Sequence, residues 1–70
     1  MRKELEDLGF VLDSSGKLMY YKSGDDSIAV MYVGGGNYNI SSYLSSTWGW
    51  KGGCPKQEVV SYITSILSKN

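Results

Sequence analysis

Between residues 20 and 50, short stretches of this chain alternate apolar and polar residues, and turn-forming residues separate the stretches. Seven of the nine aromatic residues lie there: Tyr20, Tyr21, Tyr32, Tyr38, Tyr43, Trp48 and Trp50. A period of two is typical of β-strands, and a small antiparallel sheet leaves one face open to solvent. The pattern therefore predicts such a sheet with some aromatic side chains facing outward, which favours recognition over catalysis.

Four segments have the composition of strands: 10–12, 18–22, 28–33 and 38–44. Asp, Ser and Gly predict turns at 13–17 and 23–26, and a glycine run with an asparagine separates the last two strands at 34–37. Segment 28–33 is apolar on both faces, which indicates a central strand. Residues 45–51 form either a strand or a loop, and Gly52-Gly53-Cys54 is expected to end the sheet.

Helices are predicted at both ends. Residues 1–8 fit a short helix that Gly9 ends, and Phe10 is then placed to fold back on Leu5. Pro55 suits the first position of a second helix, with Cys54 as its N-cap. An apolar stripe follows at helical spacing, made by Val59, Val60, Ile63, Ile66 and Leu67. The predicted fold class is α+β over a single domain, residues 1–70: a short N-terminal helix, an antiparallel meander of three to five strands and a C-terminal amphipathic helix packed on the sheet.

The composition of the chain narrows the classes of function that it can have. Seven basic and seven acidic residues balance, which argues against a dedicated binder of phosphate backbones and favours self-association or a bound partner. There is no histidine and only one cysteine, and no catalytic or metal-binding constellation stands out, so we predict no enzyme activity, cofactor or metal. Acidic residues near the start argue against a signal peptide, and the polar character of the longest uncharged stretch, 27–50, argues against a bilayer helix. A lone cysteine without export features then predicts a cytoplasmic protein.

The candidate partner-binding residues are Tyr43, Trp48, Trp50 and Lys51, followed by Tyr21 and Tyr38. If 47–51 is a strand, the two indoles share a face and are able to clamp a side chain or stack on bases. The alternative is that they close one end of a small core. The tyrosines are expected to line an outer face with Asn39 and Ser41, a chemistry typical of adaptable binding surfaces, although aromatic residues are also ordinary in strands.

Three other features have simpler explanations. The glycine run 34–37 precedes a strand and not a helix, so a flexible hairpin loop is favoured over a phosphate-binding loop. Cys54 has no histidine or second cysteine to complete a nucleophilic site, and Asp25-Asp26 lacks the ligands of a calcium loop.

The order of a helix, a strand meander and a helix, opened by Leu8-Gly9-Phe10, resembles the layout of HicA-type mRNA-interferase toxins and of double-stranded-RNA-binding domains. The toxins depend on a strand histidine that this sequence lacks. The resemblance implies a small RNA- or DNA-binding domain as one alternative, and Tyr/Trp stacking of a nucleotide or other small ligand is another. The leading prediction is a non-catalytic protein-binding module, with a homodimer left open. By analogy of size with accessory proteins of phages and mobile elements, it would inhibit a host or defence protein by steric occlusion.

Overall fold

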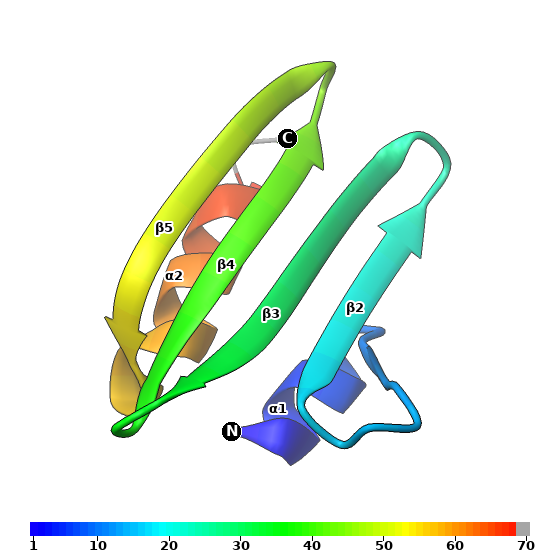
Figure 1. Ribbon diagram of the computed structural model, residues 1–70. Coiled ribbons are helices and arrows are strands. Elements are labelled where there is room, and N and C mark those ends of the chain that lie inside the picture. The colour runs from blue at the N-terminus through cyan, green and yellow to red at the C-terminus, as the bar shows by residue number, and fades with distance from the viewer. Residues whose placement is uncertain (69–70) are drawn as a thin grey trace.

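The computed structural model describes residues 1–68 and has the predicted α+β architecture (Figure 1). Its elements in chain order are α1 (Arg2–Asp7), β1 (Val11–Leu12), β2 (Leu18–Ser23), β3 (Asp26–Gly34), β4 (Asn37–Leu44), β5 (Thr47–Pro55) and α2 (Lys56–Ser68). The five strands form one antiparallel meander in the order β1-β2-β3-β4-β5, which confirms β3 as the central strand. Of residues 45–51, Ser45 and Ser46 are therefore a turn and 47–51 are strand.

The end of the sheet differs from the sequence-based prediction. β5 continues through Gly52-Gly53 as far as Pro55, and its pairing with β4 shifts between Tyr38 and Ile40. At this irregularity the Gly53 N–H donates to Asn39 Oδ1 at 3.0 Å, so a side chain supplies an acceptor where the regular ladder is interrupted. The glycines thus carry a bulge within the strand and do not terminate it.

The glycine run is a tight hairpin turn. Gly34, Gly35 and Gly36 all have positive φ, a conformation that costs glycine little because it has no Cβ. The Lys56 N–H donates to the Gly36 carbonyl at 3.0 Å, which ties this turn to the start of α2. The turn passes from strand to strand, which supports the hairpin reading over an anion-binding loop.

α1 ends as the sequence predicts. Gly9 has φ +104°, its N–H donates to the Glu6 carbonyl, and the Phe10 N–H donates to the Leu5 carbonyl at 2.9 Å. This pair of bonds is a Schellman motif, and the accompanying apolar contact is made by Leu5 and Phe10, both buried in the core. The motif turns the chain from α1 into β1.

Cys54 is not the N-cap of α2. It is the penultimate residue of β5, paired with Tyr38, and is fully buried. The strand's extension to Pro55 moves the helix start to Lys56, so the thiol belongs to the core instead of capping a helix. α2 buries Val59 and Ile63 of the predicted stripe against the sheet.

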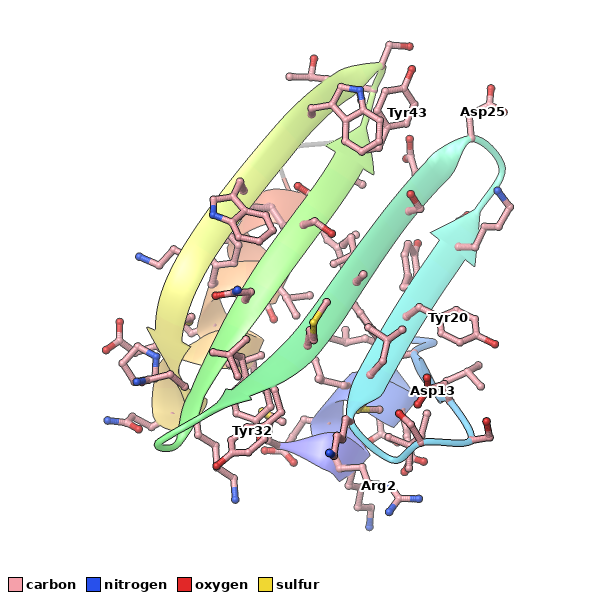
Figure 2. All side chains as sticks on the ribbon, in the orientation of Figure 1. Arg2, Asp13, Tyr20, Asp25, Tyr32 and Tyr43 are labelled. Carbon is pink, nitrogen blue, oxygen red and sulfur yellow. The ribbon has the colours of Figure 1, made fainter. Side chains whose placement is uncertain are left out.

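Both helices pack on one face of the sheet, the covered face, and lie behind it in Figure 1. The core is formed by Leu5, Phe10, Met19, Ile28, Val30, Ile40, Leu44, Cys54, Val59 and Ile63. The other face, here the open face, has no helix over it and is turned toward the viewer in Figure 2. Strand alternation places on it Val11, Leu18, Tyr20, Lys22, Ser27, Ala29, Met31, Asn39, Ser41, Tyr43, Trp48 and Trp50.

Candidate interaction surface

The open face is organised in rows that cross the strands. One row runs from β1 to β5 through directly paired residues: Val11, Tyr20, Ala29, Ser41 and Trp50. The next row runs through Lys22, Ser27, Tyr43 and Trp48. In the first row, small residues on β3 and β4 lie between Tyr20 and Trp50, and in the second row Ser27 on β3 lies between Lys22 and Tyr43.

Both tryptophans lie on the open face, as the spacing predicted for a strand. The indole-bearing residues Trp48 and Trp50 are 77% and 66% exposed, so they do not close the core. Trp48 contacts the ring of Tyr43 on β4, with centroids 4.8 Å apart and planes inclined by 52°. The contact restricts the motion of both rings, which together form a single aromatic ridge at one end of the face. Tyr43 of this ridge is labelled in Figure 2.

A shallow hollow of about 170 Å³ lies between this ridge and β2. Ser27, Ala29 and Ser41 contribute the small side chains of its floor, while Tyr20 and Trp48 are its aromatic walls. A hollow of this shape fits one apolar side chain of a partner, with hydroxyl groups beside it for hydrogen bonds.

Two of the predicted surface tyrosines lie on the covered face, contrary to the expectation that they line an outer face with Asn39 and Ser41. Tyr21 packs on Phe10 with ring centroids 5.4 Å apart, and Tyr38 packs on Tyr32 at 5.2 Å. Both are partly buried against the core. The reason is strand alternation, because each lies two residues from a core residue, Met19 or Ile40 respectively.

Lys51 also points away from the open face. It pairs with buried Ile40, and its Nζ lies 6.0 Å from the centroid of the Tyr62 ring on α2, a cation–π distance. The structure therefore brings together Tyr43, Trp48 and Trp50 of the six predicted residues. It adds Tyr20 and Met31, which are 45% and 48% exposed on the same face. Their alternation is visible in the sequence, but nothing there indicates which face the helices cover.

Charge is sparse on this surface. Among the open-face residues that the structure describes, Lys22 is the one charged side chain. Asp26 belongs to the adjoining hairpins, where its Oδ1 accepts the Ser45 N–H at 3.1 Å, so it has a local structural role. A face with one cation lacks the several basic contacts that produce affinity for nucleic-acid backbones.

Cys54 has the environment of a structural thiol. Burial raises its pKa, which disfavours the reactive thiolate, and Sγ lies 3.7 Å from the Pro55 carbonyl oxygen. Within residues 1–68 no three His, Cys, Asp or Glu side chains are grouped closely enough to hold a metal ion.

A second hollow, about 260 Å³, opens beside α1 on the covered side of the sheet. Met19 and Val30 form its apolar wall, Tyr32 and Tyr38 lie at one side, and Arg2 is nearby. Both hollows are smaller than typical small-molecule sites, and Arg2 beside the larger one is already paired with Glu6 at 3.6 Å. The open face is the stronger candidate site because it exposes both tryptophans.

Comparisons with known proteins identify no relative: no family model matches the sequence, and neither a curated protein nor a solved structure matches it significantly. Neither α1 nor α2 has the length and apolar character needed to cross a bilayer.

Proposed function

We propose that this chain is a non-catalytic protein-binding module that docks through its open face. The observation that carries the proposal is the pair of tryptophans, 77% and 66% exposed, on a sheet face that no helix covers. Large aromatic side chains grouped on a surface mark interaction sites more often than isolated apolar residues do. Tryptophan and tyrosine are also enriched among the residues that dominate binding energies.

The aromatic residues of the open face have distinct roles in the proposed binding. The Tyr43–Trp48 pair is held by its own ring contact and loses little side-chain freedom on binding, while Trp50 forms the flank of the neighbouring row. The hollow over Ala29 and Ser41 accepts an apolar side chain of the partner. The partner is thus expected to present a convex, mainly apolar patch that the module covers, and it is inhibited by steric occlusion. By analogy with small accessory proteins of similar size, the proposal extends to an origin in a phage or mobile element.

Electrostatics favours a protein over a nucleic acid as the partner. Stacking of bases on Trp48 and Trp50 would be geometrically reasonable, but backbone binding requires several cations, and the open face offers Lys22 alone. Capture of the partner is therefore expected to change little with salt and to survive nuclease treatment.

The test is affinity capture from a lysate of the source cell or its host, read by mass spectrometry, with the wild-type chain and with Trp48→Ala and Trp50→Ala. Each variant is expected to weaken capture by about 30-fold or more, the effect of losing a hot-spot residue worth about 2 kcal/mol. Circular dichroism should show native secondary structure in both variants, because these side chains contribute little to the core.

Val33→Ala is the matched control, because Val33 is 48% exposed but lies at the irregular end of β3, in the segment where the pairing with β4 shifts. It should leave capture unchanged. Unfolding of either tryptophan variant would show that the indoles are structural. A captured species that disappears with nuclease, or that weakens steeply with salt, would replace this proposal with nucleic-acid binding.

A further inference from the structure

β5 is an edge strand with its outer side unpaired in the described part of the chain. The opposite edge is short, since β1 has two residues, whereas β5 has nine. Natural proteins protect long edges with prolines, charges, bulges or covering segments, because free N–H and C=O groups there attract another strand. In β5 the bulge at Gly52-Gly53 and Pro55 lie at the C-terminal end, so the regular segment without either is Thr47–Lys51. Lys51 is the one charged residue in β5. Its side chain lies on the covered face, because it pairs with Ile40 and its Nζ lies over the Tyr62 ring.

The turn between β4 and β5 determines which backbone groups are free. The turn has two residues, Ser45 and Ser46, and both of these serines have positive φ. In a two-residue hairpin the residues that flank the turn form a hydrogen-bonded pair, and here these are Leu44 and Thr47. Hydrogen-bonded and non-hydrogen-bonded pairs alternate in an antiparallel ladder. Trp48 and Trp50 are consequently in non-hydrogen-bonded pairs, and their N–H and C=O groups point out from the sheet edge. The close contact of Trp48 with Tyr43 agrees with this assignment.

We propose that β5 pairs with β5 of a second copy of this chain, antiparallel, about a two-fold axis at Trp50. This register joins the outward-pointing residues of the two copies: Trp50 faces the partner's Trp50, and Trp48 faces the partner's Gly52. Between them, Lys51 faces the partner's Gly49. Apart from the tryptophan pair on the axis, each larger side chain of the segment lies opposite a glycine, so the strand is complementary to itself.

Neighbouring registers fit less well. Sliding the strands one step in one direction sets Lys51 opposite the partner's Lys51, which places like charges face to face. Sliding them the other way brings Trp48 opposite the partner's Trp50 and shortens the overlap, because Gly52 then meets the turn at Ser46. The balanced charge of the chain adds no net repulsion between copies.

The dimer would extend the open face across both copies into one continuous sheet, with the two Trp50 rings adjacent at its centre. This inference goes beyond the proposed function, because it concerns the assembly of the surface and not its target. A monomer could still bind a partner, and a dimer could form without one, so the two proposals fail independently.

The experiment measures mass in solution by light scattering after gel filtration, over a range of concentrations. Wild-type protein should show twice the 7.7 kDa of the chain at high concentration and shift toward the monomer on dilution. Trp50→Lys and Trp50→Glu should each be monomeric at concentrations where the wild type is dimeric, since each sets like charges opposite each other at the axis. An equimolar mixture of the two variants should regain the dimer mass.

Tyr20→Lys is the matched control: it introduces the same charge at an exposed aromatic position of the open face, but on β2, and should leave the dimer intact. A second measurement fixes the register. Trp50→Cys should form a disulfide-linked dimer on mild oxidation, because Cα atoms of a hydrogen-bonded antiparallel pair are about 5.5 Å apart, within disulfide range. Trp48→Cys should not. A monomeric wild type, a dimer unaffected by Trp50→Lys, or equal cross-linking at both positions would overturn the proposal.

Discussion

Gly49 controls the geometry of the tryptophan pair at the scale of single residues. A Cβ added at Gly49 would lie 2.6 Å from the Oγ of Ser42, its cross-strand neighbour, which is buried. That distance is shorter than any normal contact, so a larger residue at position 49 would force the Ser42 hydroxyl or the two strands to move. A glycine within a strand usually weakens it, and here steric necessity outweighs that cost.

Gly49→Ala is therefore expected to destabilise the protein by about 1–3 kcal/mol, the usual cost of overpacking, although Gly→Ala in an open strand position would stabilise it. Denaturant unfolding measures the change. Combining it with Ser42→Ala should recover part of the loss, because that substitution removes the clashing hydroxyl. A Gly49→Ala variant as stable as the wild type would contradict the close approach.

Residue-level prediction from the sequence succeeded where a single alternation was enough. The sequence predicts that Trp48 and Trp50 share a face, because a period of two leaves no other choice once 47–51 is a strand. The prediction for Tyr21 and Tyr38 is wrong because alternation states which residues share a face but not which face the helices cover. That second fact comes from tertiary packing, here from burial of Met19 and Ile40 beneath the helices.

At the scale of elements, the β4–β5 hairpin has an unusual turn. Ser45 and Ser46 have φ of +51° and +65°, a left-handed conformation that favours Asn and Gly in two-residue hairpins. The carboxylate of Asp26 accepts the Ser45 N–H and links this turn to β3. The hairpin that presents Trp48 is thus held partly by a contact from outside itself.

The variant combining Ser45→Asn and Ser46→Gly should stabilise the domain by about 1 kcal/mol, because both replacements relieve the left-handed strain. For a domain of this size, that gain corresponds to a rise in Tm of roughly 4–8 °C in a thermal melt. Ser14→Gly, in a turn where the serine does not have positive φ, should give no such rise. An unchanged or lower Tm in the double variant would show that the serines make a contact worth more than the strain.

The prediction that the sheet ends at Gly52-Gly53-Cys54 is wrong, because β5 extends to Pro55. Gly52-Gly53 has the composition of a chain break, yet the side chain of Asn39 supplies the acceptor that keeps the strand attached to β4. Such a long-range contact leaves no local signal. The same extension carries Cys54 into the core, which is why its assignment as a helix cap was also wrong.

As a whole molecule, the domain has two layers, and its core depends on a few residues of α2. Ile63 is fully buried at the interface between α2 and the sheet. A chain of 70 residues buries a smaller fraction of its surface on folding than a larger domain does, so its total stability is modest.

Ile63→Ala is expected to cost about 2–5 kcal/mol, enough to unfold much of the population at room temperature. Circular dichroism and denaturant titration measure the loss. Ile66→Ala, which removes a partly buried residue of the same helix, should cost less. Equal effects of the two substitutions would mean that α2 packs less tightly at Ile63 than its burial indicates.

The placement of the tryptophans determines what the intrinsic fluorescence of the protein reports. The chain has two tryptophans, and both are exposed on the open face. Their emission in the folded state should already resemble that of an indole in water and be quenched by iodide, so unfolding will change it little. A partner or a second copy that binds over the open face or the β5 edge will instead shift the emission to shorter wavelength and protect the indoles from quenching. Intrinsic fluorescence will therefore report association and be nearly silent on folding, the reverse of its usual behaviour in small domains.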